Sequence, residues 1–154
     1  MKAFKFIFFP LLALGTGALA GYLTSDSLET VYSTLDKSVL TPPGWVFPIV
    51  WTALYLLMGL GMAMVASKGQ LKTARSVFWW CLQLALNFGW SLLFFNVGDY
   101  FAALVCLAAL WIAILAMTIS FAAVSRLAAW LQVPYLVWVG FAGYLNAAVW
   151  VLNR

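Results

Sequence analysis

Five long apolar stretches, separated by polar segments, make up almost the whole sequence. Each is close to the roughly 20 residues that an α-helix needs to cross the hydrocarbon of a bilayer. The first polar connection, residues 24–41, is the longest. The pattern therefore predicts an all-α integral membrane protein, a bundle of five transmembrane helices. The predicted spans are residues 6–23, 45–66, 77–97, 101–124 and 128–152.

Composition supports this prediction and leaves no room for a second domain. Hydrophobic residues make up 66% of the chain and charged residues 8%, with a mean hydropathy of +1.03. Soluble domains carry about 25% charged residues. Five spans with short connections use nearly all of the 154 residues. We therefore expect residues 1–154 to form one domain within the lipid bilayer.

The first apolar stretch has two interpretations. Residues 1–5 are basic, and Ala18-Leu19-Ala20 before Gly21 resembles a signal-peptidase site. The apolar run at 6–23 is long for a signal peptide, however, and Gly17 and Gly21 have the spacing of closely packed membrane helices. We expect a retained first span and keep a cleaved signal as the alternative.

Positive residues gather in alternate connections, which predicts the orientation. Cytoplasmic loops of membrane proteins are enriched in Lys and Arg. The N-terminus should therefore be cytoplasmic and the C-terminus outside, with the connection at 24–41 facing outward. Arg154 alone opposes this orientation. The residues that carry the prediction are Lys2, Lys5, Lys68, Lys72, Arg75 and Arg126.

The connection at 24–41 has an amphipathic pattern. Its apolar positions Leu28, Val31, Tyr32 and Leu35 recur every three to four residues, as in a helix. Such a segment could lie over the end of the bundle as a lid, or it could be an ordinary interfacial loop. We expect a lid.

Several classes of function lack the residues that they need. The predicted spans hold no Asp, Glu, Lys or Arg, and the chain has no His, which argues against ion-coupled pumps, metal sites and a Ser-His-Asp hydrolase. Cys81 and Cys106 lie in apolar runs without Cys-x-x-Cys spacing, so we expect buried free thiols. The net charge of +4 comes from scattered residues. We expect no metal, no cofactor and no nucleic-acid partner.

Neutral polar and aromatic residues form helical stripes inside three spans. In hydrocarbon such amides must point into the bundle. They could act only as interhelical hydrogen-bonding groups, but three converging stripes favour a pocket for a flat apolar ligand. The stripes are Trp51 and Tyr55; Gln83, Asn87, Trp90, Ser91 and Phe94; and Tyr135, Trp138, Ala142 and Asn146.

Three sequence motifs resemble those of the TspO/MBR translocator proteins, the family of the peripheral benzodiazepine receptor and the bacterial tryptophan-rich sensory proteins. They are Pro-Pro-Gly-Trp-x-Phe-Pro-x-x-Trp-Thr-x-Leu-Tyr at 42–55, Gln-x-x-x-Asn-x-x-Trp-Ser-x-x-Phe-Phe at 83–95, and Val-Pro-Tyr-x-x-Trp-x-x-Phe-Ala-x-x-Leu-Asn at 133–146. The resemblance covers essentially the whole chain. It implies a five-helix bundle in a bacterial cell membrane, often a homodimer.

The resemblance also implies a ligand and a site. Members of the family bind tetrapyrroles such as protoporphyrin IX, and some bind cholesterol and benzodiazepine-type ligands. We therefore expect a receptor with a regulatory or transport role in porphyrin handling. Carried over to this chain, the site residues are Tyr32, Pro42, Trp51, Asn87, Trp90, Trp138, Ala142, Leu145 and Asn146.

Two alternatives follow from the same resemblance. Some bacterial members imply light- and oxygen-dependent breakdown of bound porphyrin, for which Trp51 and Trp138 would be the catalytic residues. A passive transporter of tetrapyrroles or sterols is the other. The chain departs from the family in residues 31–40, where two aromatic positions are lost, and Tyr144 lacks the following basic residue of a sterol motif.

Overall fold

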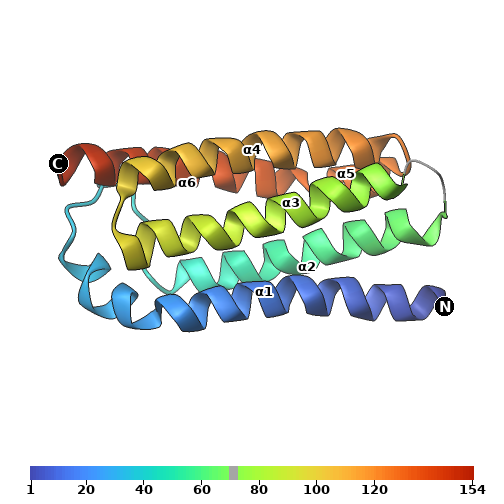
Figure 1. The fold of residues 1–154 in the computed structure, drawn as a ribbon, viewed down its shortest axis with the longest axis horizontal. Helices are drawn as coiled ribbons and strands as arrows, with labels where there is room; N and C mark the ends of the chain where they lie inside the picture. The colour runs from blue at the N-terminus through green and yellow to red at the C-terminus, as the bar shows by residue number, and fades with distance from the viewer. Residues whose placement is uncertain (70–72) are drawn as a thin grey trace.

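The computed structural model describes residues 1–69 and 73–154, and these residues form a bundle of long helices (Figure 1). Five helical stretches among them are long and apolar enough to cross a membrane, which confirms the predicted all-α five-span fold. The elements are α1 (Lys2–Thr30), the 3₁₀ turn η1 (Tyr32–Thr34), α2 (Val46–Ser67), α3 (Thr73–Ser91), the π-helical turn η2 (Leu92–Val97), α4 (Tyr100–Ala122), α5 (Arg126–Trp130) and α6 (Val133–Leu152).

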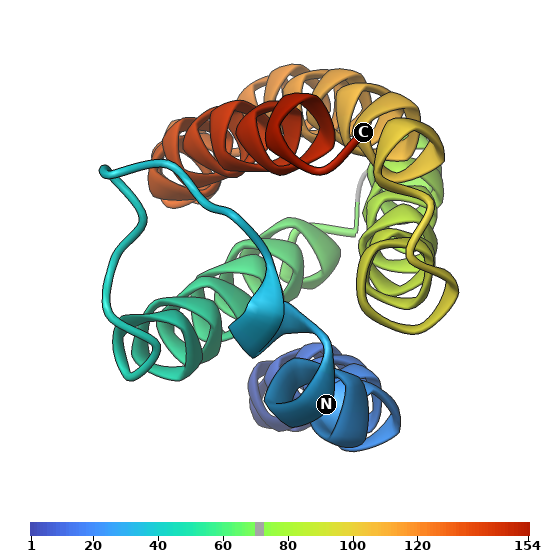
Figure 2. The ribbon, with the colours of Figure 1, turned by 90° about the vertical axis from the view of Figure 1, so that its left-hand side faces the viewer.

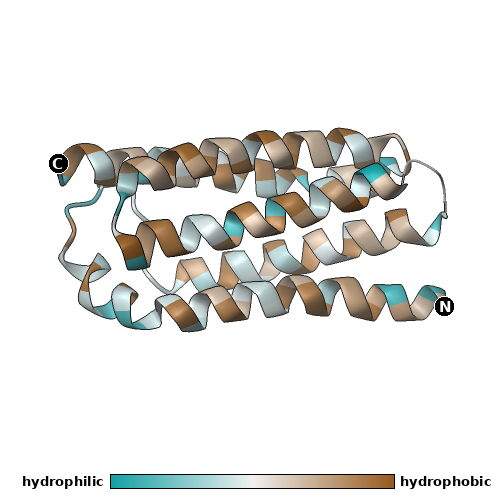
Figure 3. Cartoon of the chain, viewed as in Figure 1, coloured by the Kyte–Doolittle hydropathy of each residue, from teal (hydrophilic) through white to brown (hydrophobic). Residues whose placement is uncertain are grey.

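The helices pack mainly as neighbours in a ring. Helix α1 packs on α2, α3 on α4, and α4 on α6. The two termini lie at opposite ends of the bundle, as an odd number of spans requires (Figure 1). Large apolar side chains such as Ile49, Ile112 and Ile119 are about three-fifths exposed on the outside, at 62%, 62% and 61%. In a membrane this surface meets lipid, and hydrophilic residues gather mostly toward the ends of the helices (Figure 3).

Helix α1 is longer than the sequence pattern predicted. The apolar run ends at residue 23, but the helix continues to Thr30. Hydroxyl groups support this polar extension: Thr24 donates to the Ala20 carbonyl at 2.8 Å and Thr30 donates to the Asp26 carbonyl at 2.7 Å. The prediction of a connection from 24 to 41 is therefore wrong for residues 24–30. The helix continues for several residues beyond the point where its apolar run stops.

The segment between α1 and α2, residues 31–45, crosses the end of the bundle. It runs from α1 toward α6 and then back to α2 (Figure 2). Asn153 at the end of α6 holds it with two hydrogen bonds, since its Oδ1 accepts from the Asp36 N–H at 3.0 Å and its Nδ2 donates to the Asp36 carbonyl at 2.8 Å. Ser38 and Tyr144 share a further bond of 2.7 Å between their hydroxyls. We call residues 31–45 the lid segment.

The last span is interrupted, whereas the sequence pattern predicted one helix over 128–152. Pro134 has no N–H to donate to the carbonyl of Trp130, four residues earlier, so α5 ends at Trp130 and α6 begins at Val133, with Pro134 in its first turn. The buried Gln132 bridges the break. Its Nε2 donates to the Ala128 carbonyl at 3.2 Å and to the Leu57 carbonyl of α2 at 3.1 Å.

The turn between η2 and α4 is as short as the sequence predicted. Gly98 has a φ of 73°, a left-handed geometry that favours glycine. Asp99 then caps α4, because its Oδ1 accepts from the Ala102 N–H at 2.9 Å. The two residues fix the end of the third span against the start of the fourth.

The prediction of buried thiols is wrong for Cys81. Both cysteines are free, but Cys81 is exposed and Cys106 is only half-buried. The cause is general for membrane helices, since a lipid-facing position is as apolar as a core position. An apolar run alone therefore does not identify the buried face.

Two lysines donate hydrogen bonds to backbone carbonyls at the C-terminal ends of helices. Both lie on the side of the bundle that holds the N-terminus. Lys5 Nζ donates to the Ala66 carbonyl of α2 at 2.7 Å, and Lys68 Nζ donates to the Val124 carbonyl after α4 at 2.9 Å. Cations at helix C-termini satisfy carbonyls that have no partner within the helix. Lys72, part of the orientation prediction, lies outside the described residues.

The orientation can be tested with reporter fusions. Alkaline phosphatase, which is active only outside the cytoplasm, should be active when fused after Arg154 and inactive when fused to a chain truncated after Gly69. Green fluorescent protein should give the opposite pattern at both positions. The physical reason is the concentration of Lys and Arg at the end with Lys68 and the N-terminus. Active phosphatase after Gly69 would overturn the orientation.

The contact between α1 and α2 gives a stability prediction. A Cβ atom built on Gly59 would overlap the backbone of Pro10, which cannot move without shifting α1. Gly59→Ala should therefore lower the free energy of unfolding by about 1–3 kcal/mol. Gly15→Ala is the matched control, because no other atom lies within 4 Å of its Cβ position. The control should leave the free energy of unfolding unchanged or raise it by up to about 1 kcal/mol. Unfolding in mixed micelles measures both variants. Equal losses of stability would refute the close contact between Gly59 and Pro10.

Candidate ligand-binding site

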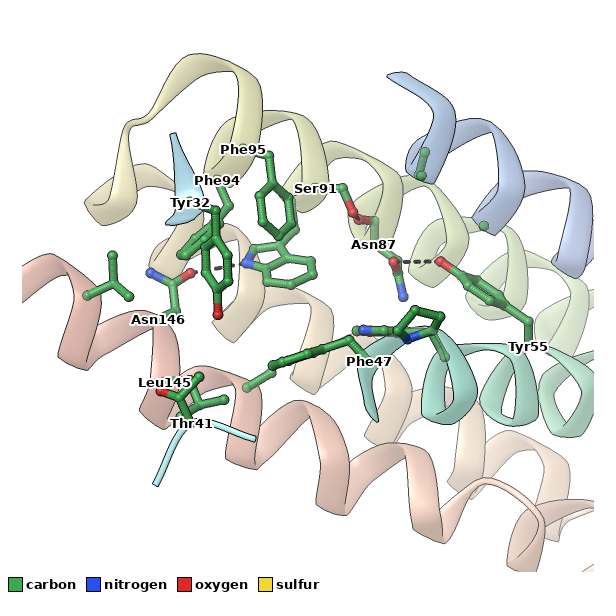
Figure 4. Close-up of a pocket in the computed structure, with 18 residues that line it drawn as sticks. Tyr32, Thr41, Phe47, Tyr55, Asn87, Ser91, Phe94, Phe95, Leu145 and Asn146 are labelled. Atoms are coloured by element: carbon green, nitrogen blue, oxygen red, sulfur yellow. Dashed lines mark hydrogen bonds between the residues drawn. The ribbon is translucent and has the colours of Figure 1, made fainter. Parts of the chain in front are cut away.

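A cavity of about 220 Å³ lies within the bundle beneath the lid segment (Figure 4). Its walls come from α1, α2, α3, η2 and α6, so segments far apart in the sequence form one site. The residues that line it are neutral. They are Gly17, Ala20, Gly21, Tyr32, Thr41, Phe47, Pro48, Trp51, Tyr55, Asn87, Trp90, Ser91, Phe94, Phe95, Ala142, Leu145, Asn146 and Val149.

Aromatic rings form the largest part of the wall. The ring centroid of Trp51 lies 5.8 Å from that of Tyr55 and 6.0 Å from that of Trp90. Trp90 continues the series to Phe94 at 5.9 Å, and Tyr32 of the lid segment lies 6.2 Å from Phe94. These separations are typical of packed aromatic pairs, so the rings present their faces and edges as a continuous surface.

A buried chain of hydrogen bonds joins three helices behind this wall. Tyr55 donates its hydroxyl proton to Asn87 Oδ1 at 3.0 Å, and Asn87 Nδ2 donates to the Tyr135 hydroxyl at 2.8 Å. Tyr135 in turn donates to Gln83 Oε1 at 2.7 Å. Gln83, Asn87 and Tyr135 are at most 1% exposed. These four side chains of α2, α3 and α6 therefore satisfy one another away from water.

A second pair fixes the other side of the cavity. The Trp90 indole N–H donates to Asn146 Oδ1 at 3.0 Å, which Figure 4 marks, and Asn146 Nδ2 donates to the Tyr100 carbonyl at 2.8 Å. The large indole is thereby held against α6, and the amide is held against the start of α4. The orientation of the Trp90 ring is set by these bonds and by packing.

Small residues of α1 make room for the cavity. Gly17, Ala20 and Gly21 lie three and four residues apart on one face and line it. A Cβ on Gly17 would overlap the Tyr55 ring, whereas no other atom lies within 4 Å of a Cβ on Gly21. Gly17 therefore allows α1 to approach α2, and Gly21 leaves space beside it.

Tyr32 forms part of the roof. It belongs to η1 and is half-buried, with its ring 5.6 Å from that of Phe95. Burial raises the pKa of the Tyr32 phenol above its ordinary value of 10, so the hydroxyl is neutral at physiological pH. The roof is therefore uncharged at this residue.

Seven of the predicted site residues line the cavity and two do not. Ala142 is 8% exposed, and its small side chain leaves space between Trp138 and Asn146 on the same face. The residues that line the cavity are Tyr32, Trp51, Asn87, Trp90, Ala142, Leu145 and Asn146. Pro42 follows the lining residue Thr41 in the lid segment, and the ring of Trp138 contacts that of the lining residue Phe47, with ring centroids 5.9 Å apart.

The Trp138 indole also has an unusual environment. Its Nε1 is buried and has no hydrogen-bond partner among the described residues. A buried donor without an acceptor usually costs about 1–3 kcal/mol. The environment of Trp138 is therefore unfavourable for its indole N–H, although its ring packs against that of Phe47.

The sequence patterns did not predict that α1 lines the cavity, and they did not identify all of the other lining residues. A signal for some of these residues was present, because Phe47 lies four residues before Trp51, and Val149 lies seven residues after Ala142 on the same helix face. The small residues of α1 carried no chemical signal of a site. The missed lining residues are Gly17, Ala20, Gly21, Thr41, Phe47, Pro48, Phe95 and Val149.

The described residues contain no group of three or more His, Cys, Asp or Glu side chains that could hold a metal ion. The lining itself contributes no acid and no base beyond neutral hydroxyls and amides. The arrangement is therefore suited to binding by shape, stacking and a few hydrogen bonds.

The chain is similar to known proteins over most of its length. A model of the TspO/MBR family matches residues 6–151. The chain is 41% identical over 144 residues to the tryptophan-rich protein TspO of Chlorobaculum tepidum, covering 92% of this chain and 91% of the relative. It is 36% identical over 153 residues to the protein of the same name in Archaeoglobus fulgidus, covering 99% of each. The human translocator protein is 39% identical over 126 residues, covering 80% of this chain and 75% of that protein.

The buried chain of hydrogen bonds predicts unequal effects of removing its two tyrosine hydroxyls. Tyr135→Phe leaves both the Asn87 N–H and the Gln83 carbonyl without their partner, so it should lower the free energy of unfolding by about 1–3 kcal/mol. Tyr55→Phe is the matched control. It removes a single bond, to an amide that faces the cavity, and should cost about 0.6 kcal/mol. Unfolding in mixed micelles measures both variants. Equal losses in the free energy of unfolding would show that the Tyr135 hydroxyl contributes no more than the Tyr55 hydroxyl.

Proposed function

Because the chain belongs to the TspO/MBR family, we propose that it is a membrane receptor for tetrapyrroles such as protoporphyrin IX, with a regulatory or transport role in porphyrin handling. The observation that carries the proposal is the cavity beneath the lid segment, which has aromatic walls and internally satisfied amides. Relatives named "translocator protein" and "tryptophan-rich sensory protein" fit such a role.

The walls suit a flat, largely apolar ligand. Trp51 and Trp90 offer ring faces for stacking, and Leu145 and Val149 offer aliphatic contacts from the opposite helix. Sites for small molecules usually combine apolar walls with a few placed polar groups. Asn87 and Asn146 supply amides here, but these amides already bind other side chains. They fix the shape of the site, and stacking and burial supply most of the attraction.

The size of the cavity implies that the lid segment moves on binding. Its volume is about 220 Å³, below the roughly 300–1,000 Å³ of typical ligand sites. A macrocycle therefore needs the roof to rise. The side-chain bonds that attach the far part of the lid segment to α6 are those of Asn153 and Tyr144, all at exposed positions. Such bonds exchange readily with water.

Receptor function is favoured over light-dependent breakdown of the porphyrin. Trp51 lines the cavity, whereas Trp138 does not; the Trp138 ring contacts that of Phe47, which does. With the lid closed, only one of the two tryptophans that the enzymatic alternative requires thus lines the cavity. We also propose that the chain works as a homodimer in a cell membrane, with the lid segment on the outer side.

The cavity predicts the effect of filling it. Ala142→Phe places a ring in the space between α2 and α6 and should weaken protoporphyrin IX binding about tenfold or more. Asn87→Ala removes the amide that holds Tyr55 and Tyr135 in place and should also weaken binding. Fluorescence quenching of the purified protein by protoporphyrin IX measures both.

Ala109→Phe is the matched control, because Ala109 is exposed on α4, away from the cavity. It should bind with the affinity of the unaltered protein. Unchanged affinity in both Ala142→Phe and Asn87→Ala would overturn the proposed site.

A further inference from the structure

Lys37 places a positive charge against the roof of the cavity. Its Nζ lies 4.8 Å from the centre of the Tyr32 ring, which lines the cavity. We propose that Lys37 pairs with a carboxylate of the ligand, so that the site selects flat apolar acids and orients them with the acidic edge at the lid. This inference rests on the proposed function and adds to it the chemical class and the direction of the ligand.

The inside of the cavity offers no positive charge to a carboxylate. All of its lining residues are neutral, and a buried anion without a cation or several donors is strongly unfavourable. The strongest donors of the inner wall are already engaged, since Asn87 Nδ2 donates to Tyr135 and Trp90 Nε1 donates to Asn146. The acidic edge of a ligand must therefore point toward the end of the cavity that the lid segment covers.

The ammonium group of Lys37 has a proton left for such a ligand. Two of its protons are directed to the carbonyl oxygens of Tyr32 and Leu35, at 2.9 Å and 2.8 Å. An ammonium has three donors. The two bonds hold the half-buried side chain beside the Tyr32 ring, which preorganises the charge. A carboxylate that passes the edge of Tyr32 can accept the third proton.

Other charges at this end of the bundle do not cancel this effect. Asp26, Glu29, Asp36 and Asp99 are exposed, so water and dissolved salt weaken their action more than that of a half-buried charge. Arg154 is also exposed, and its guanidinium lies 5.4 Å from the Trp150 ring, which does not line the cavity. Lys37 is instead half-buried and touches a lining residue. It is the charge placed to act on a bound ligand.

The test compares protoporphyrin IX with its dimethyl ester, which has the same macrocycle but no carboxylate. In Lys37→Met the Kd of the acid should rise about fivefold, while the Kd of the ester should change less than about twofold. Lys37→Arg keeps the charge and should restore most of the affinity for the acid. Higher ionic strength should weaken binding of the acid, but not of the ester, to the unaltered protein.

The ester separates a charge effect from a structural one. If Lys37 serves only to fold the lid segment, Lys37→Met will weaken both ligands equally, and the inference fails while the proposed function stands. Lys68→Met is the matched control, since Lys68 also binds a backbone carbonyl but at the other end of the bundle; it should leave the ratio of the two affinities unchanged. If neither ligand binds the unaltered protein, the proposed function fails, and this inference with it.

Discussion

The structure depends on one constraint: within hydrocarbon, each polar group must find its partner inside the protein. Gln83, Asn87 and Tyr135 meet this constraint together, in a chain of hydrogen bonds that spans three helices. The chain gives α3 and α6 a fixed register and rotation, because a small turn of either helix would leave a buried amide unpaired. Packing of apolar side chains alone tolerates such turns more easily, since lipid and protein interior are similarly apolar.

The same constraint shapes the cavity. Once the amides are paired with tyrosine, tryptophan and backbone groups, the surface that remains for a ligand is mainly aromatic and aliphatic, with Trp51 and Trp90 among its lining residues. Such a surface binds by area and shape, and it discriminates little by hydrogen bonding. Charge recognition must then come from outside the hydrocarbon. The lid segment contains charged residues, whereas the residues of the spans that line the cavity are neutral. Charge and apolar surface therefore come from different parts of the chain.

Sequence patterns predicted the fold and one side of the site, for physical reasons that also explain the failures. Amides in apolar spans must face inward, so the stripe of Asn87 and Trp90 could be placed without a structure. Small residues carry no such requirement, and the contribution of Gly17 and Gly21 to the cavity depends on how closely α1 approaches α2. Trp138 shares a helix face with Ala142, yet it does not line the cavity and its ring contacts that of Phe47 instead. A helix face specifies a direction, and only the neighbouring helix decides what the side chain reaches.

The two ends of the bundle differ in a way that bears on transport. Beyond the cavity, toward the end with Lys5 and Lys68, the core is filled by large side chains: Met58, Met62, Trp80 and Phe121 are at most 1% exposed. A passage for a macrocycle through this half would require separating α2 from α3 and α4 and breaking the bond from the Trp80 indole to the Met58 carbonyl. Opening at the lid requires the loss of a few exposed hydrogen bonds. The energetic difference favours a site that fills and empties through one end, which is the behaviour of a receptor more than of a channel.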